Sequence, residues 1–182
     1  MDKDELIEMI KESLIELNEK DSDIFKCENP RLDRLVTNER EINRELHETA
    51  LNHRFAIYLE NNLKKRKISH YSVDIEYNRN FRKRKVVIIK GVSTSVRPDI
   101  LIHKRQDKTK KYNLLAVETK KGKISGHDID KIKALLLDPD YLFDYGLSVS
   151  YCYNPNIIKC RFYSKINVNH IIDEEIIVNR NK

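Results

Sequence analysis

Two short apolar runs with charged residues at matching ends constrain the fold of this chain more than any other feature. The first run follows Arg97-Pro98-Asp99, and the second ends in Val117-Glu118-Thr119-Lys120. Apolar runs of this length between polar segments are typical of buried β-strands. If the two strands pair through the polar connection 104–111, Asp99 and Glu118 come together at one edge of a sheet.

The side chains at this edge predict chemistry. On an extended strand, residues two apart point to the same face, so Glu118 and Lys120 project together and Thr119 points away. Two partly buried carboxylates cost several kcal/mol unless a cation lies between them. Hard oxygen ligands suit Mg²⁺ or Mn²⁺. Such an ion at Asp99 and Glu118 polarises a phosphate and activates a water that Lys120 holds, which predicts phosphodiester hydrolysis.

The order Pro98-Asp99, then Glu118-Thr119-Lys120, resembles the signature of the PD-(D/E)XK nuclease superfamily. The resemblance implies an α/β restriction-endonuclease-like core, in which helices flank a mixed central sheet in the order helix, three strands, helix, strand. It also implies cleavage of nucleic acid with Mg²⁺. Asp99 and Glu118 are then metal ligands, the Thr119 backbone carbonyl is a further ligand, and Lys120 positions the attacking water.

A glutamate on the second predicted helix is a further candidate. This helix is expected to begin at Thr37 or Asn38 and to end near residue 65. Glu48 lies on its apolar face, at helical spacing from Leu51, Asn52, Phe55 and Leu59. The superfamily has a helical glutamate near its metals, so the resemblance gives Glu48 a catalytic and metal-binding role. The alternative is a salt bridge between Glu48 and Arg44 or another base.

Two more acidic residues are additional candidates for the site. Glu45 lies at the margin of the same helical stripe. Glu76 belongs to a strand expected over 71–77, in which Val73, Ile75 and Tyr77 share one face while Asp74 and Glu76 share the other. Glu76 approaches the metal site if this strand borders that of Asp99, and the simpler alternative is an exposed face on an outer strand.

The distribution of charge favours nucleic acid as the partner. The chain carries a net charge of +6, but residues 1–60 hold 9 Lys and Arg against 16 Asp and Glu, so the remainder is strongly basic. Basic clusters flank the acidic site, and a phosphate backbone is the natural partner of such a surface. Solvated loop charges are the alternative. The candidate phosphate contacts are Arg54, Arg79, Arg97, Lys121 and Lys123.

The length of 182 residues fits one domain. We expect a helical N-terminal extension over 1–36, a nuclease-like core over about 41–163 and a C-terminal extension over 165–182. An amphipathic helix is expected over 3–17, and a capping box at Ser125 and Asp128 predicts another that ends before Pro139. Strands are expected over 86–89, 145–153 and 157–163, with a mobile connection over 91–95.

The chain shows no secretory signal and no apolar run long enough to cross a bilayer, which predicts a cytoplasmic protein with no membrane association. Its three cysteines lack paired short spacing and are expected to be reduced thiols. A zinc site is not predicted, because the histidines are widely spaced.

The sequence therefore predicts a Mg²⁺- or Mn²⁺-dependent nuclease with DNA as the expected substrate. The alternatives are a non-catalytic nucleic-acid-binding module of the same fold within a larger assembly, and a purely structural protein. A homodimer would be the simplest way to cut both strands of a duplex, but no residue pattern proves it. The form of the nucleic acid and any sequence specificity stay open.

Overall fold

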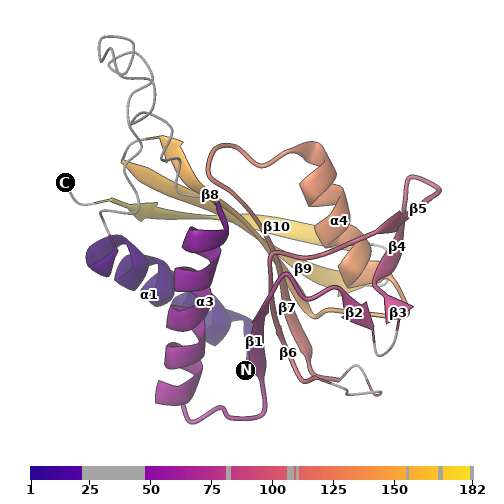
Figure 1. Ribbon diagram of the computed structural model, residues 1–182, viewed down its shortest axis with the longest axis horizontal. Helices are drawn as coiled ribbons and strands as arrows, with labels where there is room; N and C mark the ends of the chain where they lie inside the picture. Colours follow the sequence, from indigo (N-terminus) through magenta and orange to yellow (C-terminus); the bar gives the residue numbers. More distant parts are fainter. Residues whose placement is uncertain are drawn as a thin grey trace.

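The computed structural model describes residues 1–21, 48–80, 83–105, 109, 111–154, 156–167 and 170–180. A twisted central sheet separates two helices from a third (Figure 1). One core lies between the sheet and the helices α1 and α3, and the second lies between the sheet and α4. The described part of the chain is thus α/β, in agreement with the expected class.

Along the described chain, two helices are followed by seven strands, one helix and three further strands. The helices are α1 (Lys3–Lys20), α3 (Glu48–Lys65) and α4 (Gly126–Leu137). The strands of the main sheet are β1 (Ser72–Ile75), β6 (Ile100–His103), β7 (Asn113–Lys120), β8 (Tyr145–Asn154), β9 (Ile157–Asn167) and β10 (His170–Asn179). Two hairpins precede β6, namely β2 (Arg79–Asn80) with β3 (Lys83–Arg84), and β4 (Val86–Ile89) with β5 (Val92–Ser95).

The strand order of the main sheet is β1-β6-β7-β8-β9-β10. The strand β6 runs antiparallel to both of its neighbours, β1 and β7, and α4 then carries the chain over so that β8 lies parallel to β7. The predicted pairing of the two apolar runs is confirmed, with Ile100 opposite Val117. Both carboxylate-bearing strand ends therefore meet at one edge.

The helical periodicity in the sequence is confirmed. In α1, Leu6, Ile10, Leu14 and Leu17 are buried. In α3, Leu51, Asn52, Phe55 and Leu59 form the buried face, while the predicted start of this helix lies outside the described residues. The α4 helix begins at the predicted capping box of Ser125 and Asp128.

The α4 helix packs very closely on the sheet at Gly146 of β8. A Cβ atom placed on Gly146 would lie 2.2 Å from Ile132 Cγ2, which is well inside van der Waals contact. Only glycine lets the helix approach to this depth. The close approach brings the polar side of α4 near the carboxylate end of β7.

Three expectations on local structure were wrong. The first is the mobile connection expected over 91–95, where residues 92–95 form the strand β5. The C-terminal extension, for which no secondary structure was predicted, forms the long strand β10. Tyr77 does not share a face with Val73 and Ile75, because β1 ends at Ile75 and Glu76 adopts a φ of 50°, which turns the chain toward the α4 core. Cys160 is a free buried thiol as expected, but Cys152 is disulfide-bonded.

None of the described helices combines the length and the apolar character that a membrane crossing requires.

Candidate active site

The two predicted carboxylates lie side by side at the edge of the sheet. Asp99 immediately precedes β6, and its backbone N–H donates to the Val117 carbonyl at 3.1 Å. Glu118 is the next residue of β7, so the antiparallel register itself places the two side chains on neighbouring strands. The structure thus brings together the pair that the sequence predicts.

Thr119 fixes the position of the Asp99 carboxylate. Its backbone N–H donates to Asp99 Oδ2 at 2.7 Å, and its hydroxyl lies 3.1 Å from the same oxygen and 2.8 Å from Asn52 Oδ1. The buried Tyr151 hydroxyl donates to the same Asn52 oxygen at 2.9 Å. Asn52 and Tyr151 therefore form a polar support beneath the site, which sequence patterns did not single out as functional.

Glu118 is a buried carboxylate with incomplete pairing. The residue is 2% exposed, and its Oε2 accepts a hydrogen bond from Lys131 Nζ at 3.1 Å. Among the described side chains, Glu118 Oε1 is the buried polar atom that has no hydrogen-bond partner. Burial, and next the charge of Asp99, raise the pKa of Glu118 to about 7 against the opposing effect of Lys131. The unpartnered Glu118 Oε1 is therefore able to bind a cation.

Lys131 is the main site residue that sequence reasoning missed. From α4 it bridges Glu118 and Asp128, whose Oδ1 lies 3.0 Å from Lys131 Nζ. Asp128 in turn accepts from the Ser125 hydroxyl at 2.7 Å as part of the capping box. The i, i+3 spacing of Asp128 and Lys131 was visible in the sequence, but the contact with Glu118 depends on the depth at which α4 packs.

Asp99 is also destabilised as an anion. Burial raises its pKa, although the Thr119 backbone and hydroxyl hydrogen bonds and the Lys120 charge act in the opposite direction. Burial therefore disfavours the anionic form of both carboxylates. The charge of Asp99 further disfavours ionisation of Glu118, and the charge of Glu48 further disfavours ionisation of Asp99.

Glu48 reaches the same edge from α3. Its Oε1 lies 3.2 Å from Lys120 Nζ, and its Oε2 accepts from the Lys121 backbone N–H at 3.0 Å. The expected alternative of a salt bridge is thus present, with Lys120 as the base. Burial would lower the pKa of Lys120, but the hydrogen bond and charge of Glu48 outweigh it and raise this pKa, so the ammonium stays charged at neutral pH.

The residues present fit a divalent cation with hard-ligand preference. The described residues contain no group of three or more His, Cys, Asp or Glu side chains arranged around one metal position. They do contain two adjacent carboxylates, the partly buried Asp99 and the buried Glu118, and Glu118 has an unpartnered oxygen. Mg²⁺ is usually held by one or two carboxylates and keeps several waters, so a pair is sufficient.

The other predicted site residues are distributed unevenly around this edge. Glu76 follows β1 and its backbone N–H donates to the Asp99 carbonyl at 2.9 Å, while its side chain pairs with Arg97 at 3.4 Å. Lys121 and Lys123 follow β7 directly, next to the carboxylates. The second additional glutamate candidate, Glu45, lies outside the described residues.

Two predicted phosphate contacts lie in other settings. Arg54 donates to Asp21 Oδ1 and to the Tyr58 hydroxyl, each at 2.9 Å, and so joins α3 to the end of α1. Arg79 is exposed on the small β2-β3 hairpin. The structure gives neither residue a contact with the carboxylate pair.

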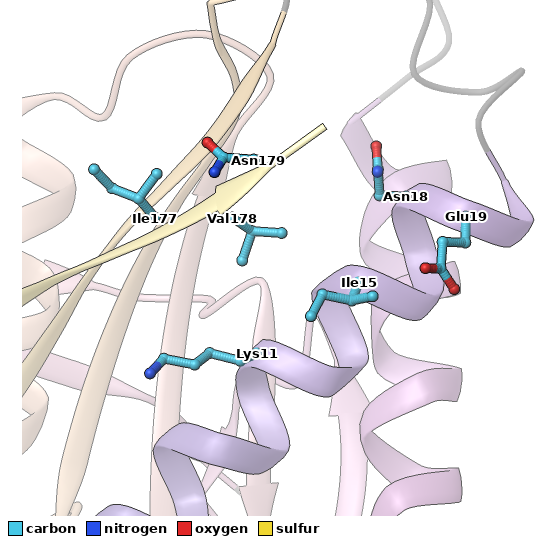
Figure 2. Close-up of a pocket in the computed structure, with 7 residues that line it drawn as sticks. All are labelled: Lys11, Ile15, Asn18, Glu19, Ile177, Val178 and Asn179. Carbon is cyan, nitrogen blue, oxygen red and sulfur yellow. The ribbon is translucent and has the colours of Figure 1, made fainter. Parts of the chain in front are cut away.

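A groove of about 280 Å³ lies between α1 and the edge strand β10 (Figure 2). Figure 2 shows that it is lined from α1 by Lys11, Ile15, Asn18 and Glu19, and from β10 by Ile177, Val178 and Asn179. No lining residue comes from α3, β6 or β7. The groove is therefore separate from the carboxylate site, and its lining holds a single Lys and a single Glu as charged groups.

Comparisons with models of protein families, with curated proteins and with solved structures find no match for this chain.

Proposed function

We propose that this protein is a Mg²⁺- or Mn²⁺-dependent nuclease that hydrolyses phosphodiester bonds in nucleic acid, with DNA as the expected substrate. The observation that carries the proposal is the adjacent pair of the partly buried Asp99 and the buried Glu118, with an unpartnered oxygen on Glu118 and a charged lysine, Lys120, two residues further along β7. A carboxylate pair in this state is a poor structural element and a good cation site.

The arrangement of elements supports the same proposal. A helix, α3, is followed by the antiparallel strands β1, β6 and β7, then by the helix α4 and the parallel strand β8. This is the order that the PD-(D/E)XK resemblance implies for a restriction-endonuclease-like core. Asp99 directly precedes β6, and Glu118 and Lys120 lie at the end of β7, so the residues of the motif come from two paired strands.

In the proposed site, Asp99 and Glu118 hold the cation, and the Thr119 carbonyl is the further ligand. When bound, a divalent cation would offset charge on the phosphate oxygens and lower the pKa of a water. Thr119 contributes in a second way, because its N–H and hydroxyl keep the Asp99 carboxylate in one orientation. Asn52 supports that hydroxyl from below.

Lys120 is the proposed water-positioning group. Its side chain is 38% exposed and pairs with Glu48, so the ammonium reaches the surface while remaining anchored. An anchored ammonium needs no reorganisation when charge builds on the phosphoryl oxygens. Glu48, with a 30% exposed side chain, positions Lys120. The role of third carboxylate that the resemblance implies for Glu48 stays a prediction, because the described residues do not form a three-carboxylate group.

Plasmid nicking tests the proposal. Supercoiled plasmid and single-stranded circular DNA are incubated with the protein in Mg²⁺, Mn²⁺ or EDTA, beside Glu118→Ala and Lys120→Ala purified in the same way. Lys64→Ala is the matched control, because Lys64 is an exposed lysine paired with Glu60 at the far end of α3. Metal-dependent nicking by the wild type and by Lys64→Ala, but by neither site variant, is the expected result.

Nicking that persists in Lys120→Ala would overturn the role of this lysine, and nicking that persists in Glu118→Ala would point to a contaminating enzyme. Salt-sensitive DNA binding without any strand cleavage would instead favour the non-catalytic binding module.

A further inference from the structure

An exposed tyrosine lies between two lysines beyond the carboxylate edge. Tyr153 of β8 is 38% exposed. Lys123 Nζ lies 5.5 Å and Lys159 Nζ 4.8 Å from the centre of its ring. Lys159 also forms an ion pair with Glu175 at 2.5 Å. Of the two lysines at the Tyr153 ring, Lys123 is therefore the one without an ion-pair partner among the described residues. The group presents one aromatic ring with positive charge on its flanks.

The strand register places Lys159, which contacts the Tyr153 ring, on the same face of the sheet as Lys120 of the proposed site. Lys120 of β7 is paired with Ser150 of β8, which is paired with Lys159 of β9. Directly paired residues share a face, and Ile158 and Cys160 on either side of Lys159 point into the opposite core. Two strand spacings separate the backbones of Lys120 and Lys159, which is about 10 Å.

This spacing matches a short piece of nucleic acid. At about 3.4 Å per stacked nucleotide, about 10 Å corresponds to roughly three nucleotides. A strand whose phosphate lies at Asp99 and Glu118 can therefore place a nearby base over Tyr153. Lys123, which follows the same β7 strand, is then next to the phosphates between these points.

The chemistry of the group selects a base that is not already paired. Aromatic side chains bind bases by stacking on their faces, and flanking cations bind the backbone. In a duplex, both faces of an internal base are covered by its neighbours. We propose that Tyr153, with Lys123 and Lys159, is a stacking site for an unpaired base, so that the substrate is single-stranded nucleic acid or carries a single-stranded segment beside the cut.

This proposal rests on the proposed nuclease function, and binding in EDTA separates the two. A fluorescein-labelled 12-nucleotide single strand and a matching duplex are titrated by anisotropy. Stacking on an aromatic side chain is worth about 1–3 kcal/mol per base, so Tyr153→Ala should weaken single-strand binding by about five- to a hundredfold. Tyr153→Phe should stay within twofold of wild type, and duplex binding should be unchanged in both.

The chain offers a matched control at the other end of β7. Tyr112 also has two lysines near its ring, with Lys104 Nζ at 4.9 Å and Lys111 Nζ at 5.7 Å. It lies eight residues before Lys120, about 26 Å along the strand. Tyr112→Ala should leave single-strand binding within twofold of wild type, and an equal loss in both alanine variants would overturn the assignment to Tyr153.

A direct readout is available because the chain contains no tryptophan. In Tyr153→Trp the new indole is the single tryptophan, and a stacking base should quench its emission when the single strand is added but not when the duplex is added. Absence of quenching, or unchanged single-strand affinity in Tyr153→Ala, would overturn this proposal and leave metal-dependent nicking by the wild type untouched. Quenching without any nicking would uphold the stacking site and reject the nuclease.

Discussion

Asp74 and Glu118 are carboxylates on β1 and β7, the two strands that flank β6, and they differ sharply in their hydrogen bonds and ion pairs. Asp74 Oδ2 accepts from His103 Nε2 at 2.9 Å and from Arg105 Nε at 2.8 Å, and its Oδ1 binds the Arg105 guanidinium as well. Glu118 has one lysine on one oxygen and no partner on the other.

The pKa values of the two groups follow from this difference. Burial would raise the pKa of Asp74, but the hydrogen bonds of Arg105 and His103 outweigh it and hold this pKa well below its usual range. Burial dominates at Glu118 and raises its pKa to about 7. Ionised Asp74 thus stabilises the fold, whereas ionisation of Glu118 lowers the stability of the fold. Such a cost is typical of a functional site.

The largest expected effect separates the two carboxylate sites by activity. Asp99→Asn removes a proposed metal ligand next to Glu118, so nicking of plasmid should fall by about a hundred- to a thousandfold, the range seen when one electrostatic contact to a transition state is lost. Asp74→Asn should nick within threefold of wild type under the same conditions. Equal losses in the two variants would mean that the contrast between the two carboxylate sites does not concern catalysis.

The second effect is the pH dependence of stability in EDTA. The folded state keeps the Glu118 proton up to about pH 7, whereas the unfolded chain releases it near 4.5. The folded state thus binds more protons, so this group lowers the free energy of unfolding as the pH rises from about 4.5 through 7.

Glu118→Gln isolates this contribution. Relative to wild type, the variant should gain about 3 kcal/mol in unfolding free energy between pH 4 and pH 8.5, as a rise of the Glu118 pKa from 4.5 to about 7 implies. Urea denaturation at the two pH values measures it. A difference between the two proteins that does not change with pH would contradict the raised pKa of Glu118.

The third effect is the stability that Asp74 provides. Asp74→Asn leaves the hydrogen bonds of His103 and Arg105 without their charged acceptor, and hydrogen bonds to a charged group contribute about 1.5–3 kcal/mol. We expect a loss of about 2 kcal/mol at pH 7, measured by urea denaturation. The loss should be smaller at pH 3, because Asp74 is then largely protonated in the unfolded chain and still ionised in the folded state. Asp99→Asn provides the comparison and should cost less, because Asp99 is destabilised as an anion.

The smallest effect concerns the lysine that partly compensates Glu118. Lys131→Met removes one positive charge next to the proposed cation position, so Mn²⁺ should bind about tenfold more tightly, which is a modest electrostatic effect at close range. Calorimetric titration at pH 8.5 keeps proton competition low. Weaker Mn²⁺ binding would mean instead that Lys131 acts mainly by orienting Glu118.

Much of the core was predictable because its signals are local. The apolar runs before Glu118 and after Asp99 paired as expected, and the capping box at Ser125 marked the start of α4. The predicted strand pairing also accounts for the meeting of the two carboxylates. In these segments, periodicity and turn chemistry agree with the tertiary packing.

The missed strands had weaker or unusual signals. The β4-β5 hairpin turns at Lys90 and Gly91, which both have positive φ, so a lysine occupies a position where Asn or Asp would have marked the turn. The β10 strand contains three consecutive acidic residues, which pair with Lys3, Lys159 and Arg161 from elsewhere in the fold. A strand stabilised by distant partners cannot be recognised from its own residues.

The candidate residues on single strands and helices were predictable from spacing, but the contacts between the helices and the sheet were not. Asp99, Glu118 and Lys120 follow from strand spacing, and Glu48 from helical spacing. The bridge from Lys131 to Glu118 and the support of Thr119 by Asn52 depend on how the helices pack against the sheet. The same packing brought Arg54 to Asp21 instead of the site.

The absence of a side chain at Gly146 couples this position to the candidate site. A Cβ there would lie 2.2 Å from Ile132 Cγ2, so an alanine requires Ile132 or the α4 backbone to move. An outward movement of α4 would carry the neighbouring Lys131 away from Glu118. Substitutions at positions 146 and 131 are therefore expected to depend on each other.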